Sequence, residues 1–187
     1  VGWNRGGFPH YYDPELMRGQ LEKSLRLLRT DRIDLYYLHH CDFGRRFESA
    51  LDFVRAAKKA GKIRFIGLSD WDDLKIMKYI DRVDPDVVQP YRNVTHDTFE
   101  KSGLSAWVEK RDAGVAFFSP IRHGLLLGKY DRPTEFPPGD FRANDAGFRD
   151  ANLLTAVRER RDQLEKKFGD VLGALIGAIL GDAPTAC

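Results

Sequence analysis

The hydrophobic positions of this chain form two alternating patterns, one with helical spacing and one of short continuous runs. The first helical pattern covers residues 14–29, and its apolar face is made by Met17, Leu21, Leu25 and Leu28. Asp13 and Pro14 mark its start, because an acidic N-cap and a proline in the first turn suit the unpaired amides there. A run of β-branched, aromatic and aliphatic residues over 33–39 then predicts a strand buried on both faces.

The same two patterns repeat along the rest of the chain. Further strands are predicted over residues 62–70, 86–91 and 115–120. Further helices are predicted over residues 47–60, 72–80, 102–112, 153–168 and 172–180. Strands that alternate with helices are parallel and joined by helical crossovers. We therefore expect an α/β fold, with about four βα units and C-terminal helices as part of a (β/α)8 TIM-type barrel, in a single domain over residues 1–187.

Each predicted strand ends in a polar residue. These residues are His39, Ser69 with Asp70, Gln89 and Ser119. Any one of them alone is as well explained by a cap or a turn, but four at corresponding places favour a polar site on one face, because chemistry in such folds lies at the carboxyl ends of strands. His39 is a candidate proton donor or hydrogen-bond donor near neutral pH.

Composition and charge narrow the classes of function. The 30 basic and 28 acidic residues leave a net charge of +2, which argues against nucleic acid or an anionic membrane as partner. No apolar run approaches the ~20 residues that span a bilayer. Cys41 and Cys187 form neither a disulfide framework nor a metal-binding pair, so a cytoplasmic protein without a metal is expected. Both ends of the chain, Val1-Gly2-Trp3 and Cys187, look cut.

Residues 121–148 form a long segment rich in glycine and proline that follows a predicted strand. Loops of this length in a compact domain are functional or disordered, and its position favours a lid over a cofactor or substrate. The charged residues of the 153–168 helix are expected to face solvent.

Four segments together resemble the aldo-keto reductase family, in its bacterial and potassium-channel-β-subunit-like branch. They are Ser24–His39, Gly61–Asp70, Val87–Gln89 with Asn93, and Phe118–Tyr130, which carries Phe-Ser-Pro-Ile-Arg-His-Gly. The resemblance covers most of the chain. It implies a barrel that binds NADPH at its carboxyl-terminal face and transfers a hydride reversibly between the cofactor and an aldehyde, ketone or aldose.

The resemblance also implies roles for individual residues. His39 matches the active-site histidine that polarises the substrate carbonyl, and Phe118 matches the aromatic residue that stacks on the nicotinamide. The nicotinamide carboxamide would be bound by Ser69, Asp70 and Gln89. The pyrophosphate would be surrounded by Ser119, Pro120, Ile121, His123 and Gly124. Basic residues for the cofactor's phosphate or adenosine half would be Lys129 and Arg142.

Three positions depart from the family's pattern. Asp70 stands where Asn is usual, Arg92 where an aromatic residue is common, and His40 where Trp is common, which suggests a more polar pocket. The family's catalytic Tyr, its Lys and the supporting Asp would precede Val1. Residues 1–187 alone are therefore expected to be inactive and to fold poorly as a monomer, since four strands leave open sheet edges.

Three hypotheses of function remain open. The first is an NADPH-dependent reductase of a small-molecule carbonyl substrate, in which NADPH rather than NADH is inherited from the family. The second is a regulatory or interaction protein that binds a nicotinamide cofactor without catalysis, and the third is a remnant without cofactor function. The alignment of polar strand-end residues favours the first. Neither a nucleic acid nor a membrane is expected as partner, and homo-oligomer formation is left open.

Overall fold

A computed structural model describes residues 12–183 and 185–187, and the chain groups into two compact units. The first unit contains the chain up to Tyr91 together with Thr98–Phe117 and Thr185–Cys187. The second unit contains Arg92–Asp97 and Phe118–Pro184. The expected single domain over 1–187 stays a prediction.

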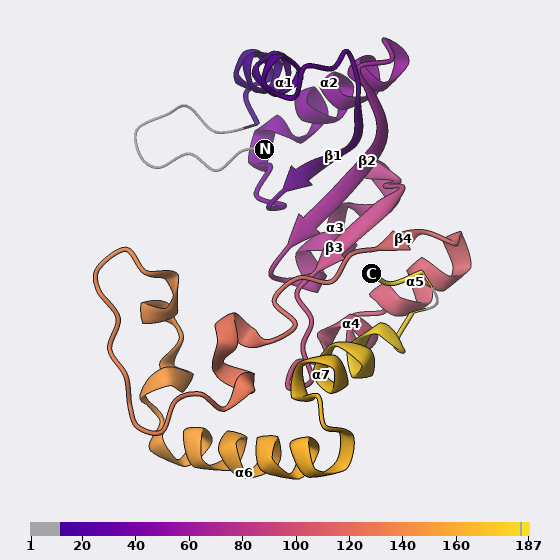
Figure 1. The fold of residues 1–187 in the computed structure, drawn as a ribbon. Helices are drawn as coiled ribbons and strands as arrows, with labels where there is room; N and C mark the ends of the chain where they lie inside the picture. Colours follow the sequence, from indigo (N-terminus) through magenta and orange to yellow (C-terminus); the bar gives the residue numbers. More distant parts are fainter. Residues whose placement is uncertain (1–11, 184) are drawn as a thin grey trace. The chain divides into compact units, whose positions relative to one another are not determined.

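The first unit is built on one parallel sheet. Its strands are β1 (Ile33–His39), β2 (Ile63–Asp70), β3 (Val87–Pro90) and β4 (Gly114–Val115). They lie side by side in the order β1-β2-β3-β4, which is also their order in the sequence (Figure 1). The predicted strand starts and the parallel βα arrangement are confirmed, because each crossover from one strand to the next contains a helix.

Helices of the first unit follow the predicted pattern closely. They are α1 (Pro14–Leu28), α2 (Phe47–Lys59), α3 (Asp73–Val83), α4 (Thr98–Lys101) and α5 (Leu104–Arg111), with a 3-10 turn η1 (Gly44–Arg46). The Asp13 carboxylate caps α1 by accepting from the amides of Glu15 and Leu16. The helices α2 and α3 pack against β2, and this buries residues such as Val54, Ile76 and Leu68 completely.

The fourth strand is shorter than predicted. It ends at Val115 rather than continuing to Pro120, although the Ala116 amide still donates to the Val88 carbonyl at 2.9 Å. Ser119 has a φ of 62°, so it lies in a left-handed turn and not at a strand end. Ala186 forms an isolated parallel bridge with Val115, so the last described residues of the chain lie beside β4.

The second unit contains three 3-10 helices and two α-helices. These are η2 (Arg122–Leu127), η3 (Phe141–Asn144), η4 (Ala146–Arg149), α6 (Ala151–Phe168) and α7 (Val171–Leu180). A small core of Leu125, Phe148 and Leu154 holds the 121–148 segment to α6. The ring of Phe148 meets Tyr130 and Phe136 edge-on, with centroids 5.0 Å apart in both pairs. The segment predicted as irregular is therefore packed around its own aromatic residues.

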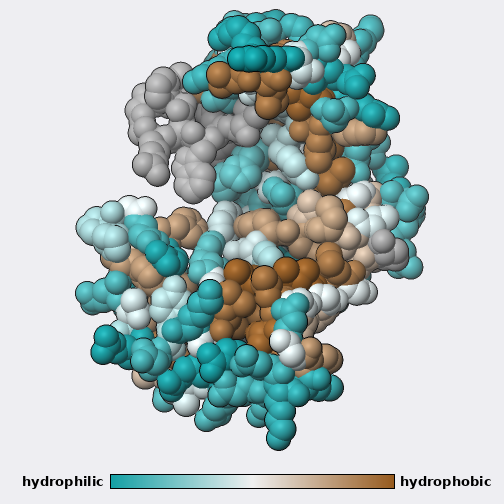
Figure 2. All heavy atoms as spheres, in the orientation of Figure 1, coloured by the Kyte–Doolittle hydropathy of each residue, from teal (hydrophilic) through white to brown (hydrophobic). Residues whose placement is uncertain are grey.

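Helix α7 is the most apolar element of the second unit, with no charged residue in its ten positions. Hydrophobic side chains gather on the molecular surface over α7 (Figure 2). Within the described part of the chain, neither α7 nor any other helix is both long and apolar enough to cross a membrane.

Candidate functional site

The carboxyl ends of β1, β2 and β3 bring three of the predicted site residues side by side. In the parallel register His39 lies opposite Ser69, and Ser69 lies opposite Gln89, so the three side chains point to the same face of the sheet. The Ser69 hydroxyl is buried and donates to the Gln89 side-chain oxygen at 3.3 Å. Strand register therefore produces a polar edge from residues that lie far apart in the sequence.

His39 and His40 form a pair at the end of β1. Their ring centroids are 4.2 Å apart and the rings are tilted by 50°. Burial lowers the pKa of His39, and the neighbouring His40 lowers it further, while Asp70 opposes the shift. This shift favours the neutral form of His39, in which the imidazole offers one hydrogen-bond donor and one acceptor.

The chain turns sharply directly after β1. His40 has a φ of 68°, in the left-handed region that residues with a side chain rarely adopt. Its amide donates to the Ser69 carbonyl at 2.8 Å. The Tyr12 hydroxyl lies 3.0 Å from the His39 carbonyl oxygen and 2.5 Å from that of His40. These contacts come from three separate elements, and sequence reasoning did not foresee them.

Asp70, the last residue of β2, is only 3% exposed. Its Oδ2 accepts from the Cys41 amide at 2.6 Å, and its Oδ1 accepts from the Asp72 amide at 2.9 Å. Buried carboxylates are tolerated when backbone amides satisfy them in this way. The carboxylate thus links the turn after β1 to the turn after β2.

In the second unit, the predicted pyrophosphate segment has an unusual backbone. Ser119, His123 and Gly124 have φ values of 62°, 54° and 90°, and Arg122 has a φ of 46°. Two tight turns form here, in which the Arg122 amide donates to Ser119 and the Gly124 amide donates to Ile121. Turns that mix right- and left-handed residues create concave groups of backbone amides that bind anions.

Side chains hold this segment in place. Arg122 forms a two-pronged ion pair with Asp145, with both nitrogen–oxygen distances 2.7 Å. The His123 ring lies 4.9 Å from the ring of Phe141, between centroids. Arg122 and Asp145 were not among the predicted site residues. The signal that could have found them is an arginine inside the resembling motif and an acid in the segment that follows it.

The two predicted basic residues differ in their surroundings. The Arg142 guanidinium bonds the Asp140 carboxylate at 2.6 Å and the Tyr130 hydroxyl at 3.2 Å, and it lies over the ring of Phe136. Its hydrogen bonds lower the pKa of Asp140 to about 2. Lys129, by contrast, is exposed. Arg142 is therefore pre-positioned by its neighbours, whereas Lys129 is free to follow an anion.

Arg92, which stands where the family pattern commonly has an aromatic residue, has a structural role. Its guanidinium donates to the carbonyls of Asn93 and His96 and forms an ion pair with Asp182 at 2.5 Å. Only 11% of its side chain is exposed. Arg92 thus ties the loop after β3 to the turn after α7, within the second unit.

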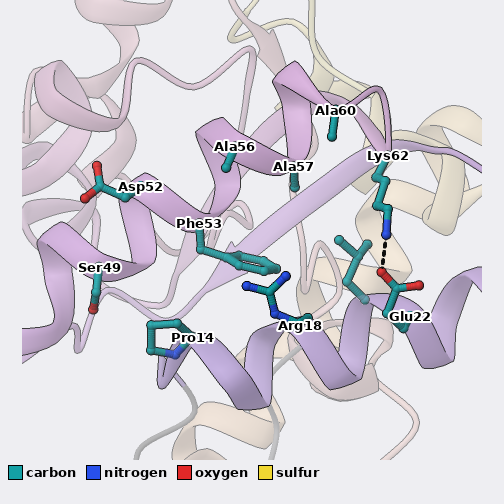
Figure 3. A pocket seen from close by; sticks show the side chains of 11 residues that line it. Pro14, Arg18, Glu22, Ser49, Asp52, Phe53, Ala56, Ala57, Ala60 and Lys62 are labelled. Carbon is teal, nitrogen blue, oxygen red and sulfur yellow. Dashed lines mark hydrogen bonds and ion pairs between the residues drawn. The ribbon is translucent and has the colours of Figure 1, made fainter.

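The helices of the first unit also form a groove of about 540 Å³ between α1 and α2 (Figure 3). Phe53 and Arg18 project into it, and Glu22 pairs with Lys62 at one end. The described residues that line this groove include none of the predicted site residues. Among the described residues there is also no group of three or more side chains that could hold a metal ion.

Comparison with known proteins supplies the family context. A model described as the aldo/keto reductase family matches residues 4–168. The aldo-keto reductase yakc of Schizosaccharomyces pombe, whose name specifies NADP(+), is 30% identical over 75% of this chain and 42% of its own length. The NADH-specific methylglyoxal reductase of Escherichia coli is 30% identical over 82% of this chain and 46% of its own length. The chain thus spans about half the length of these relatives.

Solved structures agree. The glycerol dehydrogenase of Gluconobacter oxydans is 30% identical, superposes with a TM-score of 0.79, and covers 100% of this chain and 58% of its own. A thermostable aldo-keto reductase, 19% identical with a TM-score of 0.66 over 94% of this chain and 55% of its own, shares the fold. The predicted fold class, an α/β TIM-type barrel that is incomplete in this chain, is confirmed.

Proposed function

This chain belongs to the aldo-keto reductase family, and on that premise we propose that the protein reduces a carbonyl compound to an alcohol with a nicotinamide cofactor. The observation that carries the proposal is the polar edge at the carboxyl ends of β1–β3, where His39, Ser69 and Gln89 point to one face. In barrels of parallel strands, this is the end at which chemistry takes place.

The first unit suits the nicotinamide end of such a cofactor. A carboxamide needs both a donor and an acceptor, and the Ser69 hydroxyl and Gln89 amide offer both within one hydrogen-bonded pair. Asp70, which the family resemblance also implies here, is already engaged by two backbone amides. When bound, the cofactor supplies the hydride; the residues of this chain bind it and orient the carbonyl.

The second unit carries the other residues that the family resemblance implies for the cofactor. The half-buried ring of Phe118 offers a flat face for the nicotinamide. The concave backbone over Ser119, Pro120, Ile121, His123 and Gly124 suits a pyrophosphate, and Lys129 and Arg142 supply positive charge for phosphate groups. We favour NADPH over NADH, although relatives named for each cofactor exist.

We propose that His39 acts as a neutral imidazole, in line with the lowered pKa. A neutral imidazole donates a hydrogen bond to a carbonyl oxygen and polarises it, without placing a buried positive charge beside the second histidine. His40 adds a further polar ring beside it. Both features favour a small substrate that carries hydroxyl or oxo groups next to the reacting carbonyl.

The names of two relatives point to the same size of substrate. One is a methylglyoxal reductase and the other a glycerol dehydrogenase, and both names contain a three-carbon compound. We therefore propose glyceraldehyde and methylglyoxal as first probes. We also propose a cytoplasmic location, the usual compartment for a protein whose cysteines, here Cys41 and Cys187, form no disulfide framework in the sequence.

The test measures oxidation of NADPH and of NADH by the complete protein with glyceraldehyde, methylglyoxal and a long-chain apolar aldehyde. The proposal predicts turnover with at least one three-carbon substrate and a lower kcat/KM for the apolar aldehyde. Tight NADPH binding without turnover on any carbonyl would favour the regulatory alternative. Absence of both binding and turnover would favour the remnant.

A further inference from the structure

The turn after β1 places both histidines, and it is held in a conformation that its own residues do not favour. His40 lies in the left-handed region, which is strained for a residue with a Cβ atom. Such a conformation persists only where the surrounding contacts hold it. The contacts that hold His40 therefore decide where the rings of His39 and His40 lie, since these rings are 4.2 Å apart.

Four hydrogen bonds converge on this turn. The His40 amide donates to the Ser69 carbonyl, and the Tyr12 hydroxyl bonds the carbonyls of His39 and His40. The next amide, that of Cys41, donates to the Asp70 carboxylate at 2.6 Å. Among these contacts the last is the one with a charged acceptor, and hydrogen bonds to ionised groups are the stronger kind.

The second oxygen of Asp70 is also engaged, by the Asp72 amide at 2.9 Å. With 3% of the residue exposed, the carboxylate has little surface left for a ligand. We propose that Asp70 is a positioning residue, which clamps the His39–His40 turn through the Cys41 amide rather than binding the nicotinamide. This inference rests on the proposed function, because it assigns the reacting carbonyl to His39.

The two contacts of the carboxylate also suit an acid, rather than an asparagine, at this position. Two backbone N–H groups face Asp70, one on each oxygen. An asparagine would present one oxygen and one NH2 group, so one of the two amides would face a donor instead of an acceptor. A carboxylate is the side chain of this size that satisfies both.

The test is Asp70→Asn in the complete protein, with kcat at saturating substrate and the NADPH Kd measured separately. A misplaced His39 is expected to lower kcat by about 10–100-fold while the Kd changes by less than about 2-fold. A rise in Kd as large as the fall in kcat, or no change in either, would overturn the proposal.

Two matched variants accompany it. Asp72→Asn removes the same charge two residues away, and its side chain is exposed and caps α3, where Asn serves equally well. It should leave kcat and Kd unchanged; a loss of kcat equal to that of Asp70→Asn would mean that charge, not the clamp, matters. Ser69→Ala should have the reverse effect of Asp70→Asn: the Kd for NADPH should rise, and kcat should change less.

Two further measurements keep the outcome decisive. If Asp70→Asn does not fold, Tyr12→Phe removes a second side-chain contact to the turn and should lower kcat without changing Kd; an unchanged kcat would then overturn the proposal. Hydrogen exchange at Cys41 needs no turnover, and it should accelerate in Asp70→Ala, which removes the acceptor from both amides. If the wild-type protein reduces no carbonyl, the proposed function fails, while unchanged exchange at Cys41 would refute the clamp itself.

Discussion

The ring of Tyr37 lies directly over Gly67, its partner across the β1–β2 ladder. A Cβ atom added to Gly67 would lie 2.3 Å from Cδ1 of Tyr37 and 2.5 Å from Cε1. Gly67 is buried in the middle of β2 and its φ is not positive, so the position requires space and not conformational freedom. Because Gly67 has no side chain, the large ring of Tyr37 can lie over β2, close to the strand ends that carry the site.

Gly67→Ala is therefore expected to destabilise the protein by about 1–3 kcal/mol, since the ring must leave its place or the strands must separate. Chemical unfolding of the complete protein measures this change. Gly19→Ala is the matched control: Gly19 lies within α1 with nothing within 4 Å of the added atom. That substitution should stabilise by about 0.5–1 kcal/mol. Equal effects at both positions would contradict the role of Tyr37.

Asp73 should make stability depend on pH. Burial raises its pKa from 3.8 to about 6, against the opposing hydrogen bond from Thr98. Because the folded state holds the proton more tightly, this stabilising contribution is complete below the unfolded pKa and is lost as pH rises through about 6.

Asp73→Asn removes this dependence and keeps an acceptor for Thr98. The free energy of unfolding of the variant, relative to that of wild type, should be about 1–2 kcal/mol higher at a pH above the titration than at a pH below it. Unfolding midpoints at several pH values check this. Asp52→Asn, at an exposed position of α2, serves as the control. A constant difference between the Asp73 variant and wild type across the range would show that Asp73 does not titrate there.

His39→Ala in the complete protein should lower turnover by about 10²–10⁴-fold, the usual contribution of a positioned donor. Cofactor affinity should change little, because the proposed partner of His39 is the substrate carbonyl. Steady-state kinetics and a separate NADPH titration distinguish the two effects. His39→Gln keeps a hydrogen-bond donor and should retain more turnover than the alanine variant. Normal turnover with weakened cofactor binding would show that the role is wrong.

Phe118→Ala should weaken binding of the nicotinamide cofactor by about 1–3 kcal/mol, by analogy with stacking of aromatic side chains on bases. Fluorescence quenching on NADPH addition measures it. Phe118→Tyr keeps the flat ring and should bind nearly as well as wild type. Phe168→Ala removes an exposed ring at the end of α6 and should have no effect on the affinity. Unchanged affinity in Phe118→Ala would count against this placement of the ring.

Much of the fold could be predicted because its signals are local. The cap formed by Asp13 and Pro14 lies where α1 begins, and the hydrophobic run that ends in His39 became β1. The alternation of these patterns was sufficient to predict parallel strands that lie in the order of the sequence, because helical crossover connections allow few other arrangements. Strand order in turn placed His39, Ser69 and Gln89 on one edge.

The remaining features depend on contacts between residues far apart in the sequence, and only the tertiary structure decided them. A strand is predicted over residues 115–120, yet β4 ends at Val115 and Ser119 adopts a left-handed turn. The Cys41 amide meets Asp70 from 29 residues away, and the Cys187 amide meets the Val115 carbonyl from 72. Local pattern determines which residues form an element, but the partner of a buried polar group is set by how elements pack.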